Sequence, residues 1–317
     1  MQALSHPPHF DRATGAFTGA TLVESAAVAA MQAASRITAP FGHRGHSLGC
    51  RALSLIASDR DILLHLNDDA VFSIPFADGY WSRLLNKQHH YEEEIEIFLK
   101  SVADLKYSFI DCGANFGYWS VLVSSAPFGR QRTVAIEASP ANAARLLANA
   151  RLNGDRFVGI NAAIGRDAGG FARITGHKHE ALSAVTLDRR EEGAVNIVSL
   201  DSLVVDQGLD LAVPTIVKLD VEGVEIDAIK GARNLMASHS VFICEDHGSD
   251  REHTISRFLM SETRMTVYVY DPSIARFVEV REFSTLDRIK RYSWVGYNVF
   301  ATASAFWQQR LLSAHTQ

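Results

Sequence analysis

The stretch Phe109-Ile-Asp-Cys-Gly-Ala-Asn-Phe-Gly117 decides the fold of this chain, because it joins the end of a strand to the start of a helix. Its apolar residues favour a buried strand that ends at Asp111, and a helix is expected over Tyr118–Ser124. Gly113 and Gly117 bracket a tight turn, where side chains would keep a ligand away from the backbone. The stretch therefore predicts a strand–turn–helix unit with a ligand-binding loop.

Strands and helices alternate from residue 107 onward. After the first strand, further strands are expected at 133–136, 157–164, 215–219, 241–244, 265–270 and 295–301. Helices are expected at 91–102, 140–150, 224–236 and 255–260. This alternation predicts an α/β fold with a mostly parallel seven-stranded sheet and helices on both faces. The polar segment 165–194 interrupts the rhythm and is expected to form an excursion or lid.

The first 90 residues have a different character. Residues 1–47 are expected to be a flexible segment with one helix near 21–36, and the His-rich stretch Phe41–His46 matches no common metal-site spacing. Residues 48–90 contain short apolar runs at 53–56, 62–66 and 70–74, which predict a small β meander. The α/β domain is then expected to span residues 91–317.

Composition narrows the class of protein. The 317 residues include 31 Lys and Arg against 36 Asp and Glu, a net charge of −5, which does not favour nucleic-acid binding. The three cysteines, Cys50, Cys112 and Cys244, form no CxxC pair, so a reducing, cytoplasmic setting is expected. No run of 18 apolar residues occurs, so no transmembrane helix is expected.

Four predicted strands end at acidic residues: Asp111, Glu137, Asp220 and Glu245. Ligands of parallel sheets bind at the carboxyl ends of the strands, and clustered carboxylates there need donors or a cation. Asp111 suits a cationic group such as an α-ammonium. Glu137 follows Gly117 by 20 residues, where an acid commonly accepts hydrogen bonds from ribose hydroxyls. A ligand with both features is S-adenosylmethionine.

Further motifs occur in a characteristic order along the chain. They are Phe109–Tyr118, Val134–Pro140, Asn149–Asn153, Asn161–Gly165, Leu200–Leu203, Val217–Glu225, Lys230-Gly231 and Glu245–His247. With these motifs the sequence resembles the FkbM-family methyltransferases, within the class I S-adenosylmethionine-dependent enzymes. It departs from them at Cys112, where a branched aliphatic residue is usual, and at Asp246, where an apolar one is common. The resemblance covers residues 91–301 and leaves residues 1–85 unmatched.

The resemblance implies a Rossmann-like fold and S-adenosylmethionine as cofactor. It implies a small-molecule or glycan acceptor, methylated at a hydroxyl of a sugar, polysaccharide or secondary metabolite. The cofactor-binding residues that it implies are Asp111, Gly113, Ala114, Asn115, Gly117, Glu137, Ala138, Ala163 and Asp220. In similar proteins the segment around Tyr91-Glu92 covers the cofactor, although the run Glu92–Glu94 also fits a solvated helix face. The resemblance indicates neither the exact acceptor nor the oligomeric state.

Methyl transfer to oxygen needs an aligned acceptor and a group that removes the hydroxyl proton. The candidate catalytic residues are Lys218, Asp220, Glu222, Glu245 and His247. His247 is a candidate general base, because imidazole titrates near neutrality. Asp220, Glu245 and His247 also have the composition of a divalent-cation site, so a bound Mg²⁺ stays open.

The sequence leaves two other functions open. A nicotinamide-dependent oxidoreductase would need a glycine-rich diphosphate loop, from which Asp111–Gly117 departs. A non-catalytic scaffold on the same fold would not need acids at both Asp220 and Glu245 with His247 beside them.

Overall fold

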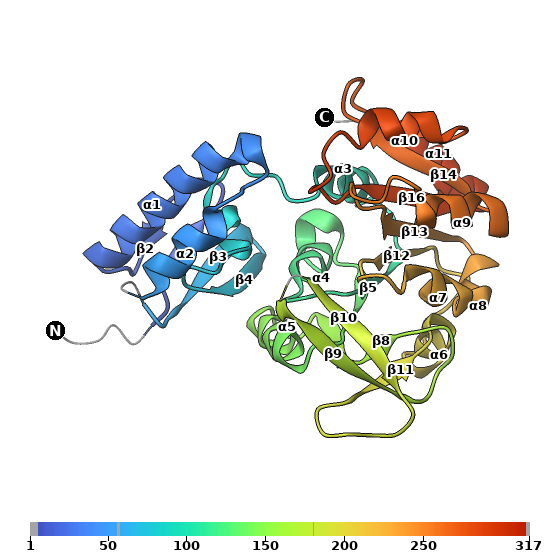
Figure 1. Ribbon diagram of the computed structural model, residues 1–317, viewed down its shortest axis with the longest axis horizontal. Helices are drawn as coiled ribbons and strands as arrows, with labels where there is room; N and C mark the ends of the chain where they lie inside the picture. The colour runs from blue at the N-terminus through green and yellow to red at the C-terminus, as the bar shows by residue number, and fades with distance from the viewer. Residues whose placement is uncertain (1–5, 56–57, 180, 315–317) are drawn as a thin grey trace. The chain divides into compact units, whose positions relative to one another are not determined.

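The computed structural model describes residues 6–55, 58–179 and 181–314 (Figure 1). Contacts divide the chain into two compact units. One contains residues 1–91 with Arg151–Gly154, and the other contains residues 92–150 and 155–317. We call them the N-terminal and the C-terminal unit. Among the described residues, no helix is both long and apolar enough to cross a membrane.

Eight of the described strands form the central sheet of the C-terminal unit, in the order β15-β14-β16-β13-β12-β5-β6-β7. Their bounds are β5 Ser108–Cys112, β6 Arg132–Glu137, β7 Phe157–Asn161, β12 Thr215–Leu219, β13 Ser240–Glu245, β14 Thr266–Asp271, β15 Arg276–Glu279 and β16 Asn298–Thr302. The five strands from β13 to β7 are parallel, and the other three pair antiparallel. The α/β class with a mostly parallel sheet is confirmed.

The eighth strand was not expected from the sequence. A turn at residues 271–276 returns the chain and lets β15 pair antiparallel with β14 at the sheet edge. The sheet also has a switch in strand order. The chain runs outward from β5 through β6 to β7 and then returns to β12 on the other side of β5. Ligands of such sheets bind at the carboxyl ends of the strands beside this switch.

Helices cover both faces of the sheet (Figure 1). Their bounds are α3 Glu93–Ser101, α4 Tyr118–Val123, α5 Pro140–Leu152, α6 Leu200–Asp206, α7 Glu225–Lys230, α8 Arg233–Met236, α9 Thr254–Glu262, α10 Phe283–Ile289 and α11 Ala305–Ser313, with a short 3-10 helix η3 at Ala126–Phe128. The helix expected at 224–236 is interrupted, because Gly231 packs closely against the carbonyl oxygens of Gly165 and Arg166. That contact separates α7 from α8.

The polar segment 165–194 and the residues on either side of it form a second sheet. The strand expected at 157–164 divides into β7 and β8 (Ala163–Ile164), and β8 joins β11 (Val195–Val198). An antiparallel hairpin of β9 (Phe171–Lys178) and β10 (Ala181–Leu187) completes the order β10-β9-β11-β8. The expected excursion is therefore an ordered β hairpin.

The N-terminal unit contains a sheet of four described strands in the order β2-β1-β3-β4. These are β1 His9–Asp11, β2 Phe17–Thr18, β3 Asp61–Asn67 and β4 Ala70–Pro75. Residues 6–47 are ordered rather than flexible, because β1 pairs in parallel with β3 and buries Phe10, while the helix expected near 21–36 is present over Leu22–Thr38. A three-residue strand such as β1 is too short for its pattern to appear in the sequence.

Three helical segments pack together in this unit. They are α1 Leu22–Thr38, α2 His46–Ser54 and the 3-10 helix η2 Trp81–Leu85, with a further 3-10 turn, η1, at Ala39–Phe41. A capping box formed by Thr21 and Glu24 begins α1, and Glu24 also pairs with Arg60. The strand expected at 53–56 is instead the end of α2 and a turn at Leu55, and residue 56 lies outside the described residues.

Both α1 and α2 contact η2. The Gln32 amide of α1 donates to the carbonyl oxygen of Leu85 at 3.1 Å, and the Cys50 thiol of α2 lies 3.3 Å from the Ser82 hydroxyl. The His46 imidazole is also 3.0 Å from Ser82. The inner faces of α1 and α2 are therefore the ones turned toward η2.

Candidate active site

The glycine-rich loop follows β5 at the switch in strand order. Gly113 has a φ of 75°, and a Cβ at this position would overlap the carbonyl oxygen of Asp220 on the neighbouring strand end. Gly117 has a φ of 90° and precedes α4, while the Asn149 amide donates to the Phe116 carbonyl at 2.9 Å. Both glycines are therefore required by the backbone itself.

Glu137 lies next to this loop at the end of β6. One carboxylate oxygen accepts the backbone N–H of Asn115 at 2.8 Å, and the other accepts that of Ser139 at 2.7 Å. Burial raises the pKa of Glu137, and these hydrogen bonds oppose the rise. The Asn142 side chain also hydrogen-bonds to Glu137. A carboxylate has about four acceptor positions, so this fixed acid can still accept from a ligand hydroxyl.

Small side chains and the β9–β10 hairpin adjoin Glu137. Ala138 and Ala163 pack in one apolar cluster with β9 and β11, and Ala114 is buried in the loop. The carbonyl oxygen of His179 accepts from the Asn115 amide at 2.7 Å and from the Asn142 amide at 2.8 Å. The ring of His179 stacks on Phe116 with centroids 4.9 Å apart. The hairpin end is thus fastened to the loop and to α5.

Asp111 lies beneath the site rather than in its opening. Its carboxyl group is almost fully buried, and the Ser120 hydroxyl donates to it at 2.6 Å. Burial raises the pKa of Asp111, although Lys218 and Ser120 oppose that rise. Asp111 is paired in register with Lys218 on β12. Its side chain is therefore placed to support Lys218 more directly than to meet a ligand.

Lys218 is a buried cation among carboxylates. Its Nζ lies 3.0 Å from Asp220 Oδ2 and 3.9 Å from Glu92 Oε2. Burial alone would lower the pKa of Lys218, but Asp220, Glu92 and Asp111 outweigh burial and raise it. A lysine that stays protonated cannot accept a proton, so the geometry favours its role as a neutralising group over that of a base.

Glu92 lies beside Lys218, so the solvated helix face, one of the two interpretations of this segment, does not describe Glu92. Its carboxylate accepts from the Trp119 indole at 2.6 Å and from the Asn298 amide at 3.2 Å. Asn298 also donates to Glu94 at 2.8 Å, and burial raises the pKa of Glu94 to about 7. Glu92 has a φ of 47°, a strained conformation that the surrounding hydrogen bonds must hold.

Glu245 ends β13, the strand that pairs with β12. The parallel register pairs Leu219 with Cys244, so Asp220 and Glu245 come next on neighbouring strands. Burial, followed by the charges of Asp220, Glu92 and Glu222, raises the pKa of Glu245 to about 9. A carboxyl group with this pKa is protonated at neutral pH and is able to donate a hydrogen bond.

The remaining candidates are less enclosed. Glu222 is exposed on the turn after β12, with a φ of 50°. Glu225 accepts the backbone N–H groups of Val221 and Gly223, so it stabilises that turn. His247 is exposed, and its Nδ1 lies 2.6 Å from the Ser249 hydroxyl and accepts the Ser249 N–H. The imidazole is therefore engaged in its own local turn.

The carboxylates do not gather with His247 as a metal centre. Among the described residues, no group of three or more His, Cys, Asp or Glu side chains is arranged to hold a metal ion. Lys218 instead supplies the positive charge beside Asp220 and Glu92. The residues present therefore do not fit the Mg²⁺ site that the sequence left open.

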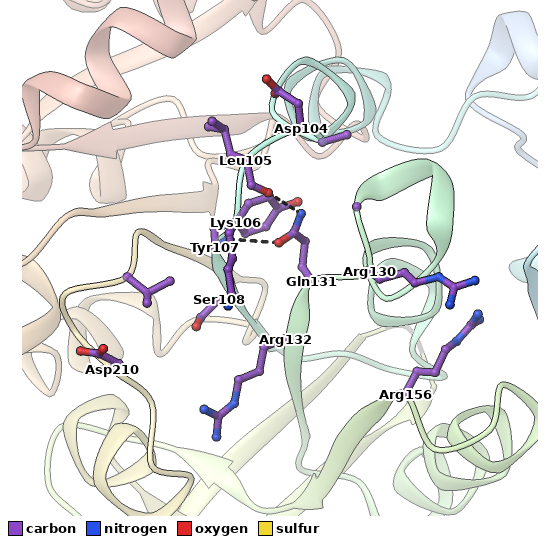
Figure 2. A pocket seen from close by; sticks show the side chains of 13 residues that line it. Asp104, Leu105, Lys106, Tyr107, Ser108, Arg130, Gln131, Arg132, Arg156 and Asp210 are labelled. Atoms are coloured by element: carbon purple, nitrogen blue, oxygen red, sulfur yellow. Dashed lines mark hydrogen bonds between the residues drawn. The ribbon is translucent and has the colours of Figure 1, made fainter.

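A separate cavity of about 700 Å³ lies at the amino ends of β5 and β6, away from the glycine-rich loop at their carboxyl ends (Figure 2). Its walls come from residues 103–108 before and within β5 and residues 129–132 before and within β6, with Arg156, Asp210 and Val213. The Gln131 amide crosses it, donating to the Leu105 carbonyl and accepting the Tyr107 N–H. This cavity adjoins the amino ends of the strands, where ligands of such sheets are not expected.

The strand order, the loop after β5 and the acid at the end of β6 define a Rossmann-like α/β protein, a class that binds its ligands at the carboxyl edge of the sheet. The sequence matches the family described as "Methyltransferase FkbM domain" over residues 111–283, more than half of the chain. The chain therefore belongs to the FkbM methyltransferase family. Comparison with curated proteins gives no match.

Solved structures similar to this chain include Methyltransferase FkbM from Methylobacillus flagellatus KT, with a TM-score of 0.39 and 17% identity over 64% of this chain and 47% of that one. P. horikoshii TYW2 in complex with MeSAdo has a TM-score of 0.38 and 14% identity, covering 78% of this chain and 72% of that one. SMU.1697c of Streptococcus mutans in complex with SAH has a TM-score of 0.38 and 10% identity, covering 68% and 98%. The chain spans less than half the length of the first of these proteins.

Proposed function

We propose that this protein transfers the methyl group of S-adenosylmethionine to a hydroxyl oxygen of a sugar, polysaccharide or secondary metabolite. Membership of the FkbM family supports methyl transfer. The observation that carries the cofactor assignment is Glu137, held by the backbone N–H groups of Asn115 and Ser139 at the carboxyl edge. A carboxylate fixed in this way is suited to accept the two ribose hydroxyls.

The α-ammonium and sulfonium groups of the cofactor would lie near the carboxylates beside the switch in strand order. Glu92 and Asp220 have the more reachable carboxylates, with side chains 16% and 25% exposed, whereas Asp111 is almost fully buried. We therefore assign the contacts with the α-ammonium and sulfonium charges to Glu92 and Asp220. Ala114, Ala138 and Ala163 would leave room for the flat adenine ring.

In the reaction, the acceptor oxygen bonds to the methyl carbon as the carbon–sulfur bond breaks, and the sulfur leaves as neutral S-adenosylhomocysteine. The hydroxyl proton must pass to a base, for which we propose Asp220. Lys218 holds Asp220 in place at 3.0 Å, and protonated Glu245 beside it can donate to the acceptor. His247 is the alternative base, because its imidazole is exposed near the same strand end.

Transfer of tritiated methyl to cell-envelope glycans, polysaccharides and secondary-metabolite extracts tests the proposal. We expect an acid-stable methyl ether as product, with turnover unaffected by EDTA. Asp220→Asn should abolish turnover while His247→Gln retains it, and the reverse result would make His247 the base. Cofactor binding without transfer to any acceptor would instead favour the scaffold function.

A further inference from the structure

The N-terminal unit has an apolar surface that its own fold leaves uncovered. The outward residues of α1 recur at helical spacing: Leu22, Ala26, Ala29, Ala33 and Ile37. The opposite side of α1 buries Ala27, Val28 and Met31. Leu22 is 91% exposed. A helix that is apolar on both sides normally has both sides covered.

The same surface continues onto η1 and α2. Phe41 in η1 is 66% exposed, and Leu48 and Leu55 are exposed one above the other along α2 and its following turn. Because the inner faces of α1 and α2 both contact η2, their outward faces lie on the side away from η2. We call this set the outer face: Leu22, Ala26, Ala29, Ala33, Ile37, Phe41, Leu48 and Leu55.

Charge distinguishes this surface from the rest of the chain. The sequence contains no Asp or Glu between residues 25 and 58, although the whole chain has a net charge of −5. Arg36, Arg44 and Arg51 lie in the same stretch and are exposed. Within residues 25–58, the outer face is therefore accompanied by exposed basic residues and by no acidic ones.

We propose that the outer face binds the surface of a bilayer that contains anionic lipids. Amphipathic helices with basic rims lie in the membrane interface, with the apolar side chains in the acyl boundary and the basic groups at the headgroups. Anionic lipids attract each such Lys or Arg. A second copy of this chain would instead bring the same arginines near each other, so charge favours the lipid surface.

Co-sedimentation of the full chain with vesicles tests this proposal. One set contains phosphatidylcholine alone, and the other contains about one quarter phosphatidylglycerol. We expect binding to the anionic vesicles that weakens at high salt, because salt shortens the range of the attraction. Arg36→Gln and Arg51→Gln should each lower the partition coefficient about fivefold, and Leu55→Gln should lower it further still.

Val205→Gln is the matched control, because Val205 is 76% exposed but lies on α6 of the C-terminal unit. It should leave partitioning unchanged, and circular dichroism should find all variants folded. Three outcomes would overturn the proposal: no binding to anionic vesicles, equal loss in Val205→Gln, or a dimer in sedimentation equilibrium that Leu55→Gln dissociates. None of these outcomes depends on methyl transfer, which the activity assay measures separately.

Discussion

Gly113 and Gly193 share a backbone φ of 75°, but they differ in what surrounds them. A Cβ at Gly113 would overlap the carbonyl of Asp220, whereas a Cβ at Gly193 would have no neighbour within 4 Å. Alanine should cost about 1–2 kcal/mol at either site from the left-handed backbone. At Gly113 the overlap should add about 1–3 kcal/mol.

Urea unfolding of Gly113→Ala and Gly193→Ala measures this difference directly. Equal destabilisation of the two variants would show that overlap with the Asp220 carbonyl does not affect the free energy of unfolding. The sequence suggested that a side chain at Gly113 would intrude on the ligand. The structure gives a different reason, because the nearest atoms belong to the backbone of Asp220, the residue that follows β12.

Glu137→Ala should weaken S-adenosylmethionine binding by about 1–3 kcal/mol, since the ribose hydroxyls would lose their acceptor. The change also releases the N–H groups of Asn115 and Ser139, so the loop would lose part of its support. Isothermal titration calorimetry measures the affinity, with exposed Glu262→Ala as control. Unchanged affinity in folded Glu137→Ala would remove this residue from the cofactor site.

Glu245 predicts a pH dependence of stability. Its pKa in the folded chain is about 9, above the ordinary value of 4.5, so folding favours the protonated form. Its contribution to stability is complete below about pH 4.5 and is lost as the pH rises toward 9. Glu245→Gln keeps the neutral form at every pH. The melting temperature of this variant relative to the parent should therefore rise between pH 5 and pH 9.

A melting-temperature difference that stays flat over this range would contradict the raised pKa of Glu245. Glu262→Gln supplies the baseline, because Glu262 is exposed.

At the scale of elements, the β9–β10 hairpin is fastened through the carbonyl of His179. Asn142→Ala removes one of its two amide donors, at an expected cost of about 1 kcal/mol. Hydrogen exchange in residues 171–187 should become faster, while exchange in β12 stays unchanged. Asn234→Ala, at an exposed position of α8, should leave exchange in the hairpin unchanged. Unaltered exchange in Asn142→Ala would mean that the Asn142 amide does not help to hold the hairpin.

Elements with strong local patterns could be predicted from the sequence. The alternation of β5, α4, β6 and α5 follows from apolar runs, Pro140 and the glycine turn, and the expected bounds are close to those observed. The break between α7 and α8 could not be predicted, because it depends on a contact between Gly231 and the distant residues 165–166. The strand β1 was missed because its three residues gain order only by pairing with β3.

The same distinction applies to the site. Asp220 and Glu245 could be placed together because both end neighbouring strands of one sheet. The hydrogen bond between Glu92 and Asn298 could not be predicted, because 206 residues separate them. No spacing rule connects the residue before a helix with a strand so distant in the sequence. His247 follows Glu245 by two residues, yet its side chain turns to Ser249. Such local hydrogen bonds have no signature in residue types alone.

At the scale of the whole molecule, deletion of residues 1–47 should unfold the N-terminal unit. The deletion removes β1, β2 and most of the helical layer, including the Glu24 partner of Arg60. Calorimetry should lose the unfolding heat of this unit, about 60 kcal/mol at roughly 0.7 kcal/mol per residue. The heat of the C-terminal unit should remain. A truncated chain that keeps the full heat per residue would restore the flexible-segment interpretation.

Lys218 has a consequence for how the site keeps its charge balance. The ammonium group of Lys218, a side chain of β12, is placed beside the carboxylates by folding, one per chain, and cannot be removed by dilution or by competition among ions. With its pKa raised by three carboxylates, it also does not change state within the physiological pH range. The positive charge beside Glu92 and Asp220 is thus part of the protein itself and does not depend on an ion bound from solution.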